Sequence, residues 1–413
     1  MDLFEKCNGS GGNFGMLRQI EDTYFVQPVL EGIPGARMIF QGKEVIMWAI
    51  NNYLGLAGNI ELQKIAAKSA QKYGAFTPMG SRLLTGNTKQ HIDLENELAS
   101  FLEKEASVVF NYGYLGVIGT INSLIGENDQ IIIDKLSHAS MIDGSIRAMK
   151  GNQFRWFEHN DMNSLEDELK KANSNRKGGL LIVTEGLFGM RGDLADLPDI
   201  CELKEKYNAR LFVDDAHGCG VMGDNGKGVG EYFNIQDKID IYFTTFAKSF
   251  ASIGGVSAGD KNVVNWIRFN ARTNIFAKAL PMIYVDTVSY ALKMIKEQPE
   301  LRIKMWDIAK RLQDGLVNLG YDIGDTQSPI TPVYVPTANI EQSMEIITRL
   351  REDFGIFVSG VIYPVVPKNV ILFRMIPTAL HTSEDVDITL KAYKAIRDQL
   401  KLDLSTKPSQ YNK

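Results

Sequence analysis

Two short apolar runs near the middle of the chain, each ending in polar residues, constrain the fold more than any other feature. The first ends in Asp214 and His217, and the second ends in Thr245 and Lys248. Both runs are too short for helices, and polar residues follow them at once, which is typical of buried parallel strands. In open α/β sheets, ligands bind at the carboxyl ends of such strands. We therefore expect these four side chains to meet at one site.

The four side chains suit pyridoxal phosphate (PLP). A lysine can form a Schiff base with the PLP aldehyde, an aspartate can keep the pyridine nitrogen protonated, and hydroxyl groups can bind the phosphate. Two plainer readings remain open. Lys248 alone could be a surface lysine at a strand end, and Asp214 or the adjacent Asp215 could be a helix cap.

The length of 413 residues exceeds what one compact core usually holds, so two domains are expected. We divide the chain into an N-terminal arm (1–46), a large cofactor-binding domain (47–281), a small C-terminal domain (282–400) and a flexible tail (401–413).

Short apolar strands alternate with helical patterns through the large domain. This rhythm predicts an α/β fold with a mostly parallel sheet and helices on both faces. The expected strands are Val108–Phe110, Gln130–Ile133, Leu180–Thr184, Leu211–Asp214 and Ile241–Thr244.

The segments on either side differ from this pattern. The arm should hold a short helix around Met16–Tyr24, a strand pair across Gln41–Gly42 and a strand over Val45–Ile50. After Pro281 the pattern predicts a smaller α+β domain, whose last helix opens at Thr382 with a sequence close to a capping box. Its other expected elements are Leu301–Leu319, Ile330–Val335, Ile340–Arg351, Ile356–Val358 and Val370–Arg374.

Composition argues against several classes of partner. The net charge is −5 with no polybasic block, which favours neither nucleic acid nor an anionic membrane. No apolar run approaches the ~20 residues of a membrane span, and the N-terminus lacks the regions of a signal peptide. The three cysteines make neither a disulfide framework nor a zinc spacing, and His217 with Cys219 is too small a set for a metal site. A cytoplasmic protein without a metal is expected.

Seven motifs together resemble the α-oxoamine synthases. The resemblance extends from about residue 40 to 400, and the joint presence of the motifs is more specific than any one of them. It implies a PLP-dependent transferase of fold type I, a homodimer with shared active sites that condenses an amino acid with an acyl-CoA and releases CO₂. The motifs are Asn51–Leu56, Gly80–Arg82, Ser137–Ser140, Thr184–Phe188, Asp214–Gly218, Thr245–Ser249 and Arg374 with His381–Thr382.

The resemblance assigns catalytic roles to four residues. Lys248 matches the Schiff-base lysine, which also acts as general base, and Asp214 matches the partner of the pyridine nitrogen. His138 matches the imidazole that stacks on the cofactor ring. His217 matches a residue that contacts the ring hydroxyl and hydrogen-bonds the incoming thioester carbonyl. A lone histidine is more often a structural core residue, but His138 and His217, two of only five histidines, both match cofactor-site positions of the motifs.

Further residues match the cofactor-binding positions. Gly113 and Tyr114 resemble the phosphate loop at a helix N-terminus, although an ordinary strand-to-helix turn would look similar. Thr245 should add a hydroxyl to the phosphate site, and Glu185 lines the substrate side. Lys278 stands in a segment that in this family reaches the phosphate of the partner subunit; an exposed surface lysine is the alternative.

Four residues match the substrate side. Arg374 resembles the arginine that binds the amino-acid carboxylate bidentately, with a surface ion pair as the alternative. Asn51 and Ser81 lie in motifs that line the site. Arg191 replaces an acidic residue of the family pattern, and Ala247 replaces a serine before the lysine. The added positive charge at Arg191, together with Lys278, suggests a more anionic substrate than serine, such as cysteate.

The implied reaction is a decarboxylative condensation of serine or cysteate with a long-chain acyl-CoA to a 3-keto sphingoid-type base. Local features resemble the serine palmitoyltransferase branch. Alternatives are 8-amino-7-oxononanoate synthase or glycine C-acetyltransferase activity, an aminotransferase or decarboxylase on the same fold, and a catalytically idle subunit. The sequence leaves the amino acid, the acyl chain length, the thioester carrier and contact with a membrane surface open.

Overall fold

The computed structural model describes residues 2–8, 27–149, 154–174, 176–336, 339–363 and 365–412. The chain divides into two compact units. The large unit comprises Tyr53–Gly189 and Asp193–Arg302, and the small unit comprises Met1–Asn52, Met190–Gly192 and Ile303–Lys413. The helix predicted around Met16–Tyr24 lies outside the described residues. The domain boundaries predicted at residues 46, 281 and 400 remain predictions.

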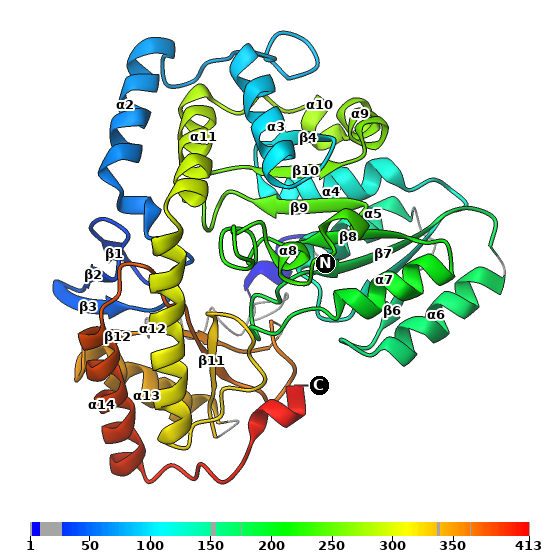
Figure 1. Ribbon diagram of the computed structural model, residues 1–413. Helices are drawn as coiled ribbons and strands as arrows, with labels where there is room; N and C mark the ends of the chain where they lie inside the picture. The colour runs from blue at the N-terminus through cyan, green and yellow to red at the C-terminus, as the bar shows by residue number, and fades with distance from the viewer. Residues whose placement is uncertain are drawn as a thin grey trace. The chain divides into compact units, whose positions relative to one another are not determined.

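The large unit is built around a seven-stranded sheet with the order β4-β10-β9-β8-β7-β5-β6. Figure 1 labels all of these strands except β5. β10 is antiparallel to both of its neighbours, and the other neighbouring pairs are parallel. The predicted, mostly parallel sheet is thus confirmed. Its strands are β4 (Ala106–Phe110), β5 (Gln130–Asp134), β6 (Arg155–Phe157), β7 (Leu180–Glu185), β8 (Arg210–Asp214), β9 (Ile241–Thr245) and β10 (Gly255–Gly259).

The central strands are almost entirely buried, and only the first residue of β8, Arg210, is exposed among β7, β8 and β9. β7 and β9 are buried at every position, as expected where helices cover both faces of a parallel sheet. One core layer joins side chains of the strands with Val117, Met141 and Ile267, which come from three different helices. The apolar runs therefore hold the strands in place, and the first polar residue after each run stands at the edge of the sheet.

Helices surround this sheet, and their ends carry local signals. Asn59 and Asp260 each accept two backbone N–H groups at helix starts, as N-cap residues do. The helix from Met282 to Glu297 was missed from the sequence. The helices are α2 (Ile60–Tyr73), α3 (Lys89–Phe101), α4 (Gly113–Leu124), α5 (Ala139–Ala148), α6 (Met162–Ser174), α7 (Leu197–Lys206), α8 (Val229–Tyr232), α9 (Lys261–Asn270), α10 (Arg272–Ile275) and α11 (Met282–Glu297).

The small unit contains two sheets, with the orders β1-β2-β3-β12 and β11-β14-β13. The strand predicted over Val45–Ile50 is shorter and earlier, because its ladder pairs end at Met47. The strands are β1 (Leu30–Glu31), β2 (Arg37–Phe40), β3 (Lys43–Met47), β11 (Thr331–Tyr334), β12 (Ile356–Phe357), β13 (Ser359–Val361) and β14 (Leu372–Met375).

The helices of the small unit pack on these strands through one core. Trp48 is fully buried there, donates to the Thr389 hydroxyl at 3.0 Å and stacks on His381 with ring centroids 3.8 Å apart. The capping box predicted at Thr382 is present, with Asp385 as its reciprocal partner. The helices are α13 (Ile340–Glu352), α14 (Ser383–Leu400) and, from Ile303 onward, α12 (Pro299–Asn318).

Candidate active site

The carboxyl ends of β7 and β8 bring two acids together. Glu185 and Asp214 are directly paired in the parallel ladder, and Asp214 is in turn paired with Phe243 on β9. Both acids end their strands and both are buried. Two buried carboxyl groups on neighbouring strands form the floor of the candidate site.

Asp214 is a buried carboxylate beside a lysine. It accepts a hydrogen bond from the Ala216 backbone N–H at 3.1 Å. Burial raises the pKa of Asp214 to about 6, while the positive charge of Lys248 opposes this rise. A cation at the end of this carboxylate would lower its pKa further and favour its charged form.

Glu185 is less acidic still. Its carboxylate accepts the Gly189 N–H at 3.3 Å. Burial and the neighbouring charge of Asp214 raise the pKa of Glu185 to about 8, and Lys248 again opposes the rise. Near neutral pH, Glu185 therefore carries a proton for much of the time and can donate as well as accept a hydrogen bond.

Lys248 lies in a compact loop directly after β9. The Phe246 N–H donates to the Gly254 carbonyl at 2.9 Å, and the Lys248 carbonyl accepts from Ala251 at 2.9 Å. These bonds close the loop and leave the lysine side chain half-buried. Its charge influences the pKa of Asp214, of Glu185 and of His138, so the structure gathers these predicted residues around one amine.

His138 forms the N-cap of α5. Its Nδ1 lies 2.8 Å from the Ser140 hydroxyl and accepts the Ser140 N–H at 3.2 Å. Burial, and then the charge of Lys248, lower the pKa of His138, so the ring is neutral at pH 7. A neutral imidazole held by a helix start presents a flat face that suits stacking.

His217 is held from two sides. Its Nδ1 lies 2.8 Å from the Tyr53 hydroxyl, and the two rings meet edge to face with centroids 6.1 Å apart. On the other side, a Cβ atom added to Gly189 would lie only 2.2 Å from Nε2, so the glycine backbone packs directly against this nitrogen. Tyr53 is fully buried. The sequence analysis quoted Tyr53 within a motif but gave it no role.

The start of α4 has the features that a phosphate site would need. The N-cap residue Tyr112 makes no side-chain capping bond, so the first N–H groups of the helix are available to an anion. A Cβ atom at Gly113 would lie 2.5 Å from Thr245 Oγ1. The helix start and the threonine therefore meet closely, as a phosphate cradle requires.

Two nearby hydroxyl groups lack partners within the described part of the chain. Ser249 and Ser252 Oγ are buried and make no hydrogen bond there. Buried polar groups are normally hydrogen-bonded, so such hydroxyls indicate a missing acceptor. Together with Lys248, Asp214 and the cradle at Gly113, they fit PLP: an aldehyde partner, a pyridine partner and a phosphate site lie in one unit.

Comparison with known proteins agrees with this geometry. The pattern of the family described as aminotransferase class I and II matches residues 43–392. Cysteate-C-fatty acyltransferase from Capnocytophaga ochracea is 46% identical over 402 residues, which cover 97% of this chain and 95% of that protein. 8-Amino-7-oxononanoate synthase from Petrotoga mobilis is 38% identical, covering 97% and 99%.

A solved structure extends the agreement to three dimensions. Serine palmitoyltransferase from S. paucimobilis, with a bound PLP–myriocin aldimine, superposes with a TM-score of 0.89 at 27% identity over 97% of this chain and 100% of that chain. The chain belongs to the α-oxoamine synthases. The predicted α/β fold of PLP-dependent transferase type I is confirmed.

Three other predicted residues of this α-oxoamine synthase lie around the edge of the large unit. Tyr114 is 42% exposed and donates to Asp143. The ammonium group of Lys278 lies 5.6 Å from the centroid of the exposed Phe76 ring. Ser81 is a turn residue whose carbonyl accepts backbone N–H groups. Their proposed ligand contacts remain predictions.

The loop that carries Ser81 has a buried anchor that the sequence did not reveal. Arg82 makes two hydrogen bonds to Glu95, at 2.9 and 3.0 Å, and both residues are buried. Glu95 also accepts from Arg268 at 2.9 Å and from the Val109 N–H at 3.0 Å. The arginine of the Gly80–Arg82 motif is therefore tied into the scaffold.

The remaining predicted residues belong to the small unit. Arg374 lies on β14, is 7% exposed and donates to the Asn51 side chain at 3.0 Å. This pairing brings two predicted substrate-side residues together. Arg191 is half-buried and precedes Gly192, whose carbonyl accepts the Gln327 N–H at 2.9 Å.

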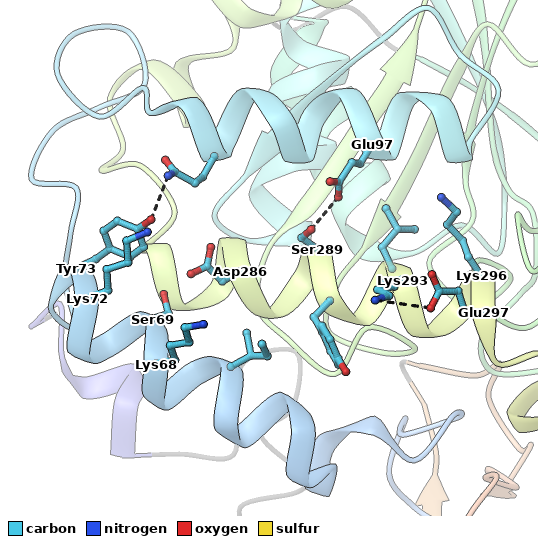
Figure 2. A pocket seen from close by; sticks show the side chains of 14 residues that line it. Lys68, Ser69, Lys72, Tyr73, Glu97, Asp286, Ser289, Lys293, Lys296 and Glu297 are labelled. Atoms are coloured by element: carbon cyan, nitrogen blue, oxygen red, sulfur yellow. Dashed lines mark hydrogen bonds and ion pairs between the residues drawn. The ribbon is translucent and has the colours of Figure 1, made fainter.

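A separate groove of about 630 Å³ lies between α2, α3 and α11 (Figure 2). Its lining carries charges of both signs, and Lys293 Nζ lies 3.8 Å from Glu297 Oε2. None of the predicted site residues lines it, so the groove and the candidate active site are distinct. The charged residues are Lys68, Lys72, Glu97, Asp286, Lys293, Lys296 and Glu297.

The described residues contain neither a cluster of metal-binding side chains nor a membrane-spanning helix. No group of three or more His, Cys, Asp and Glu side chains there could hold a metal ion. No helix in the same part of the chain is both long and apolar enough to span a membrane.

Proposed function

We propose that the enzyme condenses an amino acid with a long-chain acyl-CoA and releases CoA and CO₂, with PLP as cofactor. The observation that carries the proposal is the half-buried Lys248, whose charge acts on Asp214, Glu185 and His138 beside an open helix N-terminus at Gly113. The lysine interacts with two buried acids, Asp214 and Glu185, whose pKa values are both raised, and such shifted groups cluster at functional sites.

When bound, PLP supplies an electron sink that stabilises negative charge at the substrate Cα. Asp214 keeps a proton on the pyridine nitrogen. The N–H groups at Gly113 would hold the phosphate, and the neutral His138 ring would cover one face of the pyridine. The Thr245 hydroxyl donates to the Gly254 carbonyl at 3.0 Å and would have to rotate to reach the phosphate. These contacts fix the orientation of the cofactor relative to Lys248.

Lys248 moves the proton. Its Nζ, when unprotonated, removes the hydrogen from the substrate Cα as general base. The half-buried Lys248 lies directly after β9, and its charge interacts with the buried acids Asp214 and Glu185. Arg374, paired with Asn51 at 3.0 Å, binds the substrate carboxylate that is later lost as CO₂.

His217 orients the acyl substrate. If the Tyr53 hydroxyl donates to Nδ1, the proton of the neutral ring must lie on Nε2. Nε2 can then donate to the thioester carbonyl and stabilise the negative charge that develops on it. The Tyr53 hydroxyl thus selects the useful tautomer.

Cysteate is the amino acid that we favour. Arg191 adds a positive charge that a sulfonate can pair with, and the relative from Capnocytophaga ochracea that acts on cysteate is 46% identical. Serine is the second candidate, because the fold superposes on a serine palmitoyltransferase with a TM-score of 0.89.

Product assays test the proposal. Purified holoenzyme is incubated with cysteate, serine, glycine or alanine and with palmitoyl-CoA or acetyl-CoA, and CoA and CO₂ are measured together. Equal amounts of CoA and CO₂ with palmitoyl-CoA and cysteate or serine support it. Turnover of glycine with acetyl-CoA alone would refute the long-chain assignment, and amine transfer without CoA release would identify an aminotransferase.

The enzyme also acts as a homodimer with shared active sites in the reducing cytoplasm. Support for the dimer comes from exposed apolar side chains beside the site loops: Phe76, Met79 and Leu84 after α2, and Phe276 before Lys278. Support for the compartment comes from the free thiols of the buried Cys201 and Cys219. Light scattering coupled to size-exclusion chromatography measures the oligomeric state.

A further inference from the structure

A short hairpin follows β7 and leads back into the scaffold. Leu187 and Leu194 form an antiparallel bridge, and the Phe188 N–H donates to the Asp193 carbonyl at 3.0 Å. Gly189 begins the tip of this hairpin, which spans residues 186–195. The apolar legs are buried, so they fix the base of the hairpin but not the direction of its tip.

His159 fastens one leg of the hairpin to the sheet. Its Nδ1 lies 3.1 Å from the carboxylate of Asp134 at the end of β5, and its Nε2 lies 2.9 Å from the carboxylate of Asp193. The three side chains are only 5%, 1% and 9% exposed. The ring also meets Phe188 edge to face, with centroids 4.4 Å apart.

The geometry requires a charged ring. A neutral imidazole has one N–H donor and one bare nitrogen, and a bare nitrogen facing a carboxylate would be repelled. Burial alone would lower the pKa of His159, but the hydrogen bonds to Asp134 and Asp193 outweigh burial and raise it to about 9. His159 is therefore an imidazolium at physiological pH.

The tip of the hairpin touches the candidate active site. The Gly189 N–H donates to Glu185, and the same residue packs against Nε2 of His217 so closely that a Cβ atom would overlap it. A displacement of the Asp193 leg would therefore move the surface against which His217 rests.

We propose that His159 is a positioning residue, whose two hydrogen bonds hold the hairpin 186–195 so that Gly189 sets the orientation of His217. The consequence for turnover rests on the proposed function of His217. The bridge itself stands on the geometry of His159, Asp134 and Asp193 alone.

The pH dependence follows from the groups around the ring. Asp134 faces it from β5, Asp193 faces it from the hairpin, and the neutral Asn160 donates to the Leu194 carbonyl at 2.8 Å. An exposed ion pair joins Lys135 and Glu158, which adjoin Asp134 and His159 in the sequence. Folding raises the pKa of His159 from 6.5 to about 9. The charged ring therefore contributes fully to the stability of the folded state below pH 6.5, and this stabilisation is lost as the pH rises through about 9.

The variant His159→Gln tests the proposal through the ratio of its kcat/KM to that of the wild-type holoenzyme. At neutral pH we expect the variant to be lower by about tenfold to hundredfold, because small misplacements of catalytic groups have effects of that size. The ratio should approach one above pH 9, where the wild-type ring also loses its charge. Effects of titrating groups whose pKa does not depend on His159 cancel in the ratio; Glu185, whose pKa the charge of Asp134 raises, is not among these groups.

A direct readout does not depend on activity. In protein labelled with ¹⁵N-histidine, the two ring nitrogens of His159, assigned by their loss in His159→Gln, should both carry protons at pH 7.5 and titrate together near pH 9. A neutral ring at pH 7.5 would overturn the proposal. Protonated nitrogens in an enzyme without condensation activity would instead refute only the proposed function.

Two further variants complete the test. Lys135→Gln breaks the exposed neighbouring pair and should leave kcat/KM unchanged, since such pairs contribute little. If His159→Gln does not fold, Asp193→Ala removes one hydrogen-bond partner of the bridge and keeps the bond to Asp134. A folded variant of either kind with wild-type kcat/KM across pH 7–10 would show that the bridge does not position His217.

Discussion

Glu185 and Asp214 occupy directly paired positions at the ends of two adjacent parallel strands, and each is buried. Their proximity, with burial, raises the pKa of Glu185 to about 8, while Asp214 titrates near 6. The two acids are thus separated in strength although their positions on the sheet are equivalent. Asp214 is the one that is charged at neutral pH, as a partner of a protonated pyridine must be.

The buried Glu185 makes the stability of the cofactor-free protein depend on pH. Its folded pKa of about 8 exceeds the ordinary value of 4.5, so the folded state binds more protons between these values and stability falls as the pH rises through them. Glu185→Gln should remove this loss of stability, because glutamine has no proton to release. We expect the variant to gain on the order of 1–3 kcal/mol over the wild type between pH 5 and pH 8.

Urea unfolding at a series of pH values measures the effect. Glu158→Gln, at an exposed position paired with Lys135, serves as the control and should follow the wild-type curve. The raised pKa of Glu185 would be contradicted if the free energies of unfolding of Glu185→Gln and the wild type differed by the same amount at every pH from 5 to 8.

Lys248→Ala should abolish both cofactor attachment and proton transfer. We expect the visible absorbance of the lysine-bound cofactor to disappear and kcat to fall by at least about 10³-fold, as for loss of a general base. Lys261→Ala, an exposed lysine at the start of α9, is the control. Absorption spectra and single-turnover assays give the two readouts, and retained turnover would exclude Lys248 as the base.

Much of the fold could be read from the sequence, because the central strands are continuous apolar runs that end in polar residues. β8 and β9 were recognised in this way, and parallel pairing then places Asp214 beside its neighbours without further information. β10 was not recognised, because Gly255–Gly259 consists mainly of small residues and shows no apolar run. It is buried because β4 and β9 pair with it on either side and α3, α4 and α9 pack against it.

The contacts that orient the site were harder to predict. Tyr53 and His217 are 164 residues apart in sequence, and His159 joins carboxylates 25 residues before it and 34 residues after it. No local pattern marks such pairs. Their signal is a buried polar side chain that must find a partner, which becomes visible only once the chain is folded.

Gly113→Ala should weaken cofactor binding without disturbing the chemistry at Lys248. The new methyl group would lie 2.5 Å from Thr245 Oγ1, so the helix start or the threonine must move. Overpacking typically costs ~1–3 kcal/mol, and we therefore expect the Kd for PLP to rise about 10-fold to 100-fold.

Fluorescence titration of the cofactor-free protein measures this Kd. The matched control is Gly126→Ala, just beyond the other end of α4, where the nearest atom is the flexible end of Asp129 at 3.2 Å. Equal effects of the two substitutions would mean that Gly113 has no special relation to the phosphate.

Arg191 should determine the preference for an anionic side chain. We expect Arg191→Met to lower kcat/KM for cysteate about tenfold to hundredfold, because the charge-assisted hydrogen bond to the sulfonate is lost. The kcat/KM for serine should change little, because serine has no sulfonate. Arg191→Lys keeps the charge and should retain part of the preference. Steady-state assays with both amino acids decide the point, and a parallel loss for both would assign Arg191 a structural role.

Gly189→Ala should disturb His217 specifically. The added Cβ atom would lie 2.2 Å from Nε2 and 2.5 Å from Cδ2 of the imidazole, and the ring cannot withdraw without breaking its 2.8 Å bond to Tyr53. The substitution does not touch Lys248, Asp214 or the proposed phosphate site at Gly113, so the cofactor should still bind. We expect kcat to fall about tenfold to hundredfold, as for a small misplacement of a catalytic group.

The design separates this effect from a general loss of stability. Gly35→Ala is the matched control, since its nearest contacts would be an ordinary 3.7 Å away. Tyr53→Phe removes the bond on the other side of the ring and should lower kcat as well, but the double variant should lose less than the product of the two single effects. Because both substitutions act through one imidazole, a ring that has already moved has little more to lose. Fully multiplicative losses would show that Gly189 and Tyr53 act on different groups.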